Sequence, residues 1–237
     1  MRRHIPNMIT CCNLLSGCVA AVFAFEGVYT IAFACIIMGA VFDFFDGLTA
    51  RALKVSSPIG KELDSLADVI TFGLAPATMA YSWLCECASA HLDMLVASAM
   101  PFAAFLLVAF SALRLAKFNV DASQKEEFEG LPTPASAILC LSLAALCQRY
   151  QLTIGLEWLA LISVLVAALL VSPIKMFSFK FHSWGLGDKD NILRFGFLIV
   201  SCLLICLLKL YAIPTIIVMY IAVSALRWVL MKHKNKE

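Results

Sequence analysis

Charged side chains are scarce in this chain of 237 residues, because Asp, Glu, Lys and Arg together make up only 14% of it. Soluble domains carry about 25% charged residues and are roughly half apolar, whereas 62% of the side chains here are hydrophobic and the mean hydropathy is +0.91. A net charge of only +2 gives no broad basic surface, which excludes a nucleic-acid-binding domain. The apolar content excludes a disordered chain. The composition therefore predicts an integral membrane protein.

The sequence also lacks the usual patterns of a zinc site and of a cleaved signal peptide. All ten cysteines except Cys85 and Cys87 lie in apolar runs, where cysteine behaves as a small hydrophobic residue. The C-x-C pair has no second pair and no nearby histidine cluster, so we expect no zinc there. Arg2 and Arg3 precede the first apolar run, but no small-residue cleavage site follows it. We therefore expect this run to be a permanent membrane anchor.

Long apolar runs recur along the whole chain. A membrane-spanning helix needs about 20 mostly apolar residues, and eight runs approach that length: 8–25, 29–50, 65–84, 95–116, 132–148, 154–172, 192–208 and 211–230. The connections between neighbouring runs are short, which favours a compact bundle of antiparallel helices. We expect an all-α integral membrane protein with about eight transmembrane helices in a single domain, 1–237.

The basic residues predict how this bundle is oriented, since Lys and Arg collect on the cytoplasmic side of membrane proteins. With the N-terminus inside, all but two of the 18 Lys and Arg residues fall on the cytoplasmic side, the exceptions being Arg149 and Lys209. Both termini are then cytoplasmic. The segment 174–190 is predicted either to lie along the inner leaflet or simply to connect two spans.

Four aspartates stand at the facing ends of two neighbouring spans. Asp43 and Asp46 close the second span three residues apart, and Asp64 and Asp68 open the third four residues apart, so each pair shares one helix face. A short loop joins the two antiparallel spans and brings the pairs together near the cytoplasmic interface. Carboxylates this close repel one another unless a cation offsets their charge. Hard divalent cations such as Mg²⁺ and Mn²⁺ take oxygen ligands of this kind, so the pattern predicts a metal site.

The residues around the aspartates suit a phosphate ligand. Gly47 and Gly60 lack a Cβ, which lets a bulky ligand approach the backbone closely. Arg51 lies one turn beyond Gly47 and can offer a forked donor to phosphate oxygens. Together these residues predict a metal-assisted phosphoryl-type transfer at the inner membrane surface.

Residues 43–68 read DFFDGLTARALKVSSPIGKELDSLAD and match every fixed position of the pattern D-x2-D-G-x2-A-R-x8-G-x3-D-x3-D. This stretch resembles the signature of the CDP-alcohol phosphatidyltransferases. The resemblance implies a core of six membrane helices, a homodimer, and transfer of a phosphatidyl group from a CDP-linked lipid to an alcohol with release of CMP. We accordingly expect a family-like core in residues 1–172, followed in 173–237 by a cytoplasmic loop and two additional helices.

Three further stretches resemble the phosphatidylserine synthase branch of this family. They are IPNMITCCNLLSG at 5–17, RLAKFNV at 114–120 and FEGLPTPA at 128–135. The resemblance covers roughly the first 135 residues, and the later helices share only its general character. It implies CDP-diacylglycerol and L-serine as substrates, and a multi-pass protein of the cytoplasmic membrane whose active site faces the cytoplasm.

The resemblance also implies roles for individual residues. Asp68 would act as general base on the serine hydroxyl. Two Mg²⁺ or Mn²⁺ ions would be held by Asp43, Asp46, Asp64 and Asp68. The CDP-diacylglycerol head group would be held by Pro6, Asn7, Thr10, Gly47, Arg51, Ser57 and Gly60. The candidates for the serine carboxylate are Arg114, Lys117 and Asn119. No activated Ser, Cys or His stands beside the motif, so we expect direct attack rather than a phosphatidyl-enzyme.

Other interpretations of these residues stay open. Gly47 and Gly60 also suit helix packing, and Ser57 also suits a connecting loop. Arg114 and Lys117 also suit anchors whose charges reach the interface. The acceptor could instead be glycerol 3-phosphate, inositol or an inositol phosphate. A cation or proton transporter also uses intramembrane carboxylates, although it would be expected to place them nearer the midplane.

Overall fold

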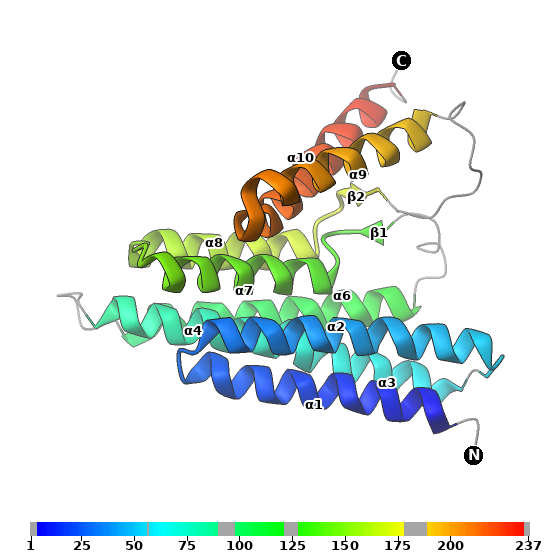
Figure 1. Cartoon of the computed structure of the whole chain (residues 1–237), viewed down its shortest axis with the longest axis horizontal. Coiled ribbons are helices and arrows are strands. Elements are labelled where there is room, and N and C mark those ends of the chain that lie inside the picture. The colour runs from blue at the N-terminus through cyan, green and yellow to red at the C-terminus, as the bar shows by residue number, and fades with distance from the viewer. Residues whose placement is uncertain (1–3, 56, 90–97, 121–127, 178–188, 235–237) are drawn as a thin grey trace.

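The computed structural model describes residues 4–55, 57–89, 98–120, 128–177 and 189–234, which are almost entirely helical (Figure 1). The helices in chain order are α1 (Ile5–Phe25), α2 (Tyr29–Ala52), α3 (Pro58–Asp68), α4 (Ala75–Ala88), α6 (Leu106–Val120), α7 (Thr133–Tyr150), α8 (Leu156–Leu170), α9 (Lys189–Leu208) and α10 (Ala212–Lys234). This confirms the all-α prediction. One short addition was not expected: strands β1 (Phe128–Glu129) and β2 (Lys175–Met176) pair antiparallel, with Phe128 opposite Met176.

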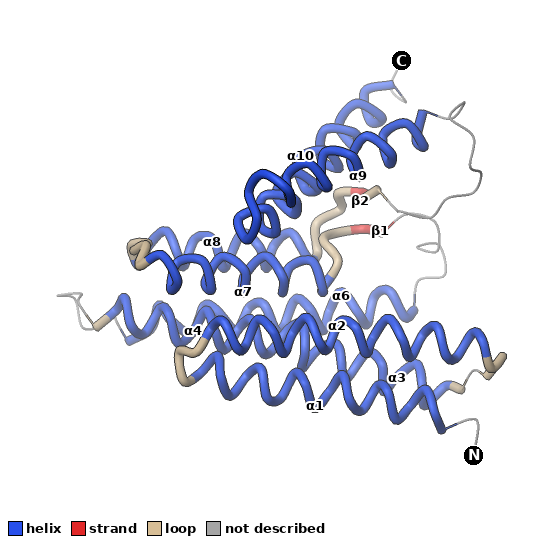
Figure 2. The backbone as a smooth tube through the Cα atoms, viewed as in Figure 1, coloured by secondary structure: helices blue, strands red, loops and turns tan. Residues whose placement is uncertain are grey.

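Helical structure is present in each of the eight predicted apolar runs, but fewer segments are long and apolar enough to cross a membrane. Those in the described part are Ile5–Phe25, Tyr29–Ala52, Met100–Val120 and Asn191–Lys232. The last combines α9 and α10, which a 3-10 turn at Lys209–Tyr211 folds back into a hairpin (Figure 2). The structure thus supports a membrane protein, while the number of crossings stays a prediction.

The third predicted span departs most from a regular helix. It begins early, at Pro58, and runs through α3 into a π-helical segment, Val69–Leu74, that continues as α4. α3 is amphipathic rather than apolar, because Lys61, Glu62 and Asp64 interrupt it. The π-helical segment lies directly after Asp68, and such insertions into α-helices are frequent at functional sites.

Small residues allow α1 to lie close to α2 and to the π-helical segment. The buried face of α1 carries Thr10, Asn13, Gly17, Ala20 and Ala24, three or four residues apart. This spacing places them on one side of the helix. Side chains of this size let neighbouring backbones approach closely. α1 contacts both α2 and α3, and so it holds the second half of α2, with the first two motif aspartates, near α3.

The protein core lies around α7, most of whose residues are buried. The C-terminal hairpin packs on this core through α10, which contacts α7 and β2. Tyr220 of α10 donates a hydrogen bond from its hydroxyl to the carbonyl oxygen of Phe177 at 3.0 Å, and the rings of these two residues are 4.8 Å apart. In Figure 2 the α9–α10 hairpin leaves the main bundle at an angle.

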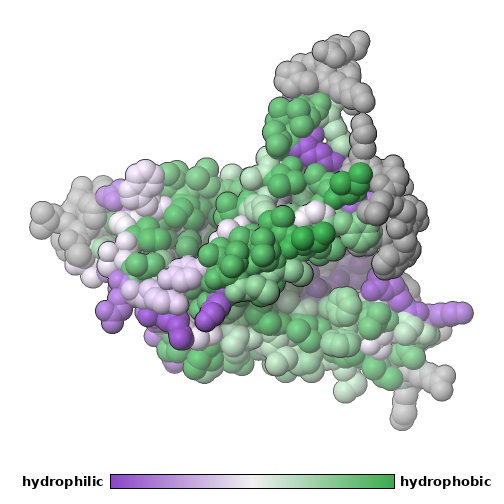
Figure 3. Space-filling model, turned by 45° about the horizontal axis from the view of Figure 1, so that its top comes forward, coloured by the Kyte–Doolittle hydropathy of each residue, from purple (hydrophilic) through white to green (hydrophobic). Residues whose placement is uncertain are grey.

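The ends of the helices divide into two groups. Figure 1 shows the start of α1, the α2–α3 connection and the end of α10 toward one side of the molecule, and the α1–α2, α7–α8 and α9–α10 connections toward the other. Hydrophobic side chains cover the middle of the face seen in Figure 3. This arrangement suits an even number of crossings. Which end faces the cytoplasm stays a prediction, and Arg2, Arg3 and most of 174–190 lie outside the described residues.

Candidate active site

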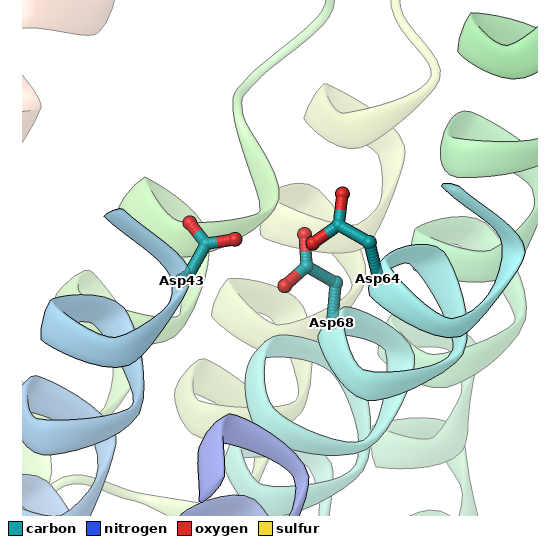
Figure 4. A group of neighbouring side chains, drawn as sticks. All are labelled: Asp43, Asp64 and Asp68. Atoms are coloured by element: carbon teal, nitrogen blue, oxygen red, sulfur yellow. The ribbon is translucent and has the colours of Figure 1, made fainter. Parts of the chain in front are cut away.

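Three of the four motif aspartates gather at one point. Asp43 comes from α2, while Asp64 and Asp68 come from α3 and point toward it across the gap between the helices (Figure 4). One carboxylate oxygen from each residue lies within 4.8 Å of the others. Asp68 is only 8% exposed, and the other two are partly buried. The α2–α3 connection thus brings three aspartates together, whereas the sequence predicted that all four would converge.

Asp46 lies next to this group but makes a different contact. It is 5% exposed, and its Oδ2 accepts a hydrogen bond from the Thr10 hydroxyl at 2.6 Å. This bond joins the start of α1 to the end of α2. Asp46 and Asp64 both line the cavity described below, so the carboxylate group borders that cavity. Its membership of the metal site stays a prediction.

The chemistry of the three carboxylates fits a hard divalent cation. Oδ1 of Asp64 is buried and has no hydrogen-bond donor among the described residues. Within the described part, no Lys or Arg forms an ion pair with Asp43, Asp64 or Asp68. A buried carboxylate oxygen that has no donor and lies beside two further carboxylates is a suitable ligand for Mg²⁺ or Mn²⁺.

Asn13 and Thr71, for which the sequence predicted no role, support the carboxylate group. Asn13 is fully buried in α1 and donates from Nδ2 to Oδ1 of Asp68 at 3.2 Å. Thr71, in the π-helical segment, donates to the backbone carbonyl of Asn13 at 3.0 Å. A polar side chain inside an otherwise apolar span is a functional candidate, and this signal would have identified Asn13.

A cavity of about 210 Å³ opens beside the aspartates, between α1, α2 and α3. Six of the seven residues predicted to hold the CDP-diacylglycerol head group line it: Pro6, Asn7, Thr10, Gly47, Ser57 and Gly60. Arg51, the seventh, is exposed in the last turn of α2 and is not among the lining residues. The cavity is also lined by Lys61, which was predicted only to be one of the basic residues on the inner side.

The two motif glycines face this cavity in different ways. A Cβ added to Gly47 would meet no atom within 4 Å, so this position is open rather than packed against another helix. At Gly60 a Cβ would lie 3.0 Å from Oγ of Ser57 and 3.1 Å from Oδ1 of Asn7, so little space is left there. Ser57 caps α3, since its Oγ accepts a hydrogen bond from the Gly60 amide at 3.0 Å. Ser57 thus fixes where α3 starts as well as lining the cavity.

The three residues predicted for the serine carboxylate lie in the last two turns of α6, and each contacts a different partner. Arg114 donates from Nη1 to the Thr133 hydroxyl at 3.5 Å, and its buried Nε has no partner among the described residues. Lys117 forms a largely exposed ion pair with Glu129 at 2.7 Å. Asn119 donates from Nδ2 to Oγ of Ser65 at 2.8 Å. Their role in acceptor binding stays a prediction.

Comparison with known proteins identifies the class that this fold and site define. The sequence model of the CDP-alcohol phosphatidyltransferase family matches residues 3–171, which include the aspartates and the whole cavity. The chain belongs to this family, as the motif in residues 43–68 predicted. The match favours a transferase over the transporter that intramembrane carboxylates also allowed.

Individual relatives point to one branch of the family. The chain is similar to a CDP-diacylglycerol–serine O-phosphatidyltransferase of Helicobacter pylori, with 29% identity over 97% of this chain and 92% of the relative. It is also similar to proteins of the same name from Bacillus subtilis and Methanocaldococcus jannaschii. The first is 34% identical over 76% of this chain and 93% of the relative, and the second is 30% identical over 72% of each.

Proposed function

We propose that this protein is a CDP-diacylglycerol–serine O-phosphatidyltransferase, which transfers the phosphatidyl group of CDP-diacylglycerol to L-serine and releases CMP. The observation that carries the proposal is the group of Asp43, Asp64 and Asp68 beside a cavity lined by the family motif. Serine as the acceptor is supported by the shared name of relatives that align with most of this chain.

We propose that Asp43, Asp64 and Asp68, joined by Asp46, hold two Mg²⁺ or Mn²⁺ ions. When bound, such ions polarise the phosphate and offset the negative charge that develops on the departing CMP. The support for this is the buried, donor-free oxygen of Asp64 and the three carboxylates that converge there without a direct ion pair to a described Lys or Arg.

Asp68 suits the role of general base. The serine oxygen forms a bond to the phosphorus that carries the diacylglycerol group, and the bond from that phosphorus to the bridging oxygen breaks. CMP leaves with the electron pair, while the hydroxyl proton passes to the carboxylate of Asp68. A positioned carboxylate can take this proton as the new bond forms. The hydrogen bond from Asn13 holds Asp68 in place for this step.

The remaining assignments concern the substrates and the membrane. Asn7, Thr10 and Ser57 offer polar groups to the cytidine phosphate part of the donor, and Gly47 leaves room for it. Arg114, Lys117 and Asn119 are proposed to hold the serine carboxylate. We further propose a homodimer in the cytoplasmic membrane with the active site toward the cytoplasm, a core in residues 1–172, and an addition in 173–237.

The proposal is tested by CMP release from purified protein with CDP-diacylglycerol and Mn²⁺ or Mg²⁺. Serine, glycerol 3-phosphate and inositol are compared as acceptors. Serine should be used, and Asp68→Asn should lower the rate by about two to four orders of magnitude, the usual contribution of a general base. Glu86→Gln is the matched control, because Glu86 is an exposed acid in the last turns of α4. Release with another acceptor alone would refute serine and keep the transferase chemistry.

The metal site has a test that does not depend on turnover. Mn²⁺ should raise the melting temperature of the wild-type protein by several degrees, because a ligand that binds only the folded state stabilises it. Asp64→Asn should melt higher than the wild type in EDTA, since it removes one repelling charge, and should respond little to Mn²⁺. An equal response of wild type and variant would exclude Asp64 as a ligand.

A further inference from the structure

The cavity beside the aspartates contains a single basic side chain among its described lining residues. Its charged residues are Asp46, Asp64 and Lys61. The diphosphate of a CDP-linked lipid is anionic, and the two carboxylates repel it. Arg51, which the motif suggested as the phosphate partner, is exposed and does not line the cavity. Lys61 is therefore the lining side chain whose charge favours the donor.

Lys61 is held by one backbone contact and one side-chain contact. Its backbone follows Gly60 in the first turn of α3, and its backbone amide bonds to the carbonyl of the N-cap residue Ser57 at 3.2 Å. Its Nζ donates to the backbone carbonyl of Asn119, at the end of α6, at 2.9 Å. A lysine ammonium group has three hydrogens to donate. One is used by Asn119, and two are left for a ligand in the cavity.

A second contact holds the same two helices together. The side chain of Asn119 donates to Oγ of Ser65, which lies one helical turn after Lys61. Asn119 thus contacts α3 twice, once through its backbone carbonyl and once through its side-chain amide. Lys61 thus lines the cavity while its ammonium is held at the end of α6, where the acceptor residues were predicted. No bond to a carboxylate neutralises Lys61 in the described part of the chain.

We propose that Lys61 is the cationic contact of the donor's phosphates, and that the Asn119 carbonyl positions its ammonium group at the edge of the cavity. The inference rests on the proposed function, because it takes CDP-diacylglycerol as the ligand. The proposal gives different roles to two basic residues of the motif region. Lys61 contacts the donor, whereas Arg51 lies outside the cavity and makes a smaller contribution.

The test compares variants of Lys61 in CDP-diacylglycerol binding without serine and in turnover. Lys61→Met keeps the length of the side chain and removes the charge. It should weaken CDP-diacylglycerol binding about tenfold, as expected for loss of one hydrogen bond to a charged group, and should raise the KM for this substrate by a similar factor. The KM for serine should change less than twofold. Lys61→Arg should recover part of the affinity.

Lys54→Met is the matched control, because Lys54 is an exposed lysine of the α2–α3 connection and does not line the cavity. It should leave binding and both KM values unchanged. Melting temperatures near that of the wild type would show that the Lys61 variants are folded. Unchanged donor binding in Lys61→Met, or an equal loss in Lys54→Met, would overturn the inference. Wild-type protein that binds CDP-diacylglycerol but releases no CMP with serine would refute the proposed function alone.

Discussion

Asn13 shows how one side chain in an apolar helix contributes to the site. It is fully buried, donates to Asp68 from Nδ2, and leaves its own Oδ1 without a donor among the described residues. A buried amide oxygen without a donor costs stability, and an apolar residue at this place would avoid that cost. The presence of an amide at this position is therefore better explained by its hydrogen bond to Asp68, which orients that carboxylate, than by the stability of the helix pair.

At the residue scale, we predict that Asn13→Leu lowers kcat about ten- to a hundredfold, because a hydrogen bond to a charged group contributes about 1.5–3 kcal/mol. The KM for CDP-diacylglycerol should change little, since Asn13 does not line the cavity. Steady-state CMP release measures both constants. Ser142→Ala, which removes a buried hydroxyl bonded within α7, should keep wild-type kinetics. A raised KM with unchanged kcat would show that Asn13 does not position the general base.

The candidate site could be predicted from the sequence because its residues follow one another at fixed spacings across a single hairpin. Helix periodicity and a short loop were enough to predict that the aspartate faces, Gly47 and Gly60 lie at one site. Lys61 and Asn13 were missed for different reasons. The charge of Lys61 was used only to predict the orientation in the membrane. Its contact with Asn119 joins residues 58 positions apart, and the sequence pattern does not show such a contact. The partner of Asn13 is 55 positions away, and such pairings depend on how the helices pack.

At the element scale, the π-helical segment was the main feature that hydrophobic periodicity did not predict. Val69–Leu74 looks like any apolar helical stretch, and its irregularity depends on neighbours rather than on its own residues. Thr71 lies against Gly17 of α1 and Gly39 of α2 so closely that neither position has room for a Cβ. Two glycines on neighbouring helices therefore accommodate one threonine that also bonds to Asn13.

This packing predicts that Gly17→Ala destabilises the protein by about 1–3 kcal/mol, the usual effect of overpacking. The added Cβ would lie 2.6 Å from the Cα of Thr71, so backbone must move. Activity should fall as well, because Thr71 supports Asn13 and thereby Asp68. Gly196→Ala in α9 is the control, since its Cβ would meet nothing within 4 Å and alanine favours helices. Equal melting temperatures for the two variants would contradict the close packing.

At the scale of the whole molecule, the distribution of charge and the position of the site lead to the same orientation. The aspartates and the cavity lie at the end of the bundle where α2 and α3 are connected, together with Arg51, Lys54 and Lys61. Arg149 and Lys209 lie near the α7–α8 and α9–α10 connections, toward the other end (Figure 1). Because basic residues are retained on the cytoplasmic side, the site should open toward the cytoplasm, where CDP-linked lipid and serine would meet.

Reporter fusions in a bacterial host test this orientation. A fluorescent protein that matures only in the cytoplasm should fluoresce when it is fused after residue 237. Alkaline phosphatase should be active when it is fused to a chain truncated after Gln151. The same phosphatase fused after Val55, in the α2–α3 connection beside the cavity, should be inactive. As a control, changing Arg149 to Gln should leave all three results unchanged, since it adds to the existing asymmetry. Phosphatase activity at Val55 would place the aspartates outside and contradict the orientation.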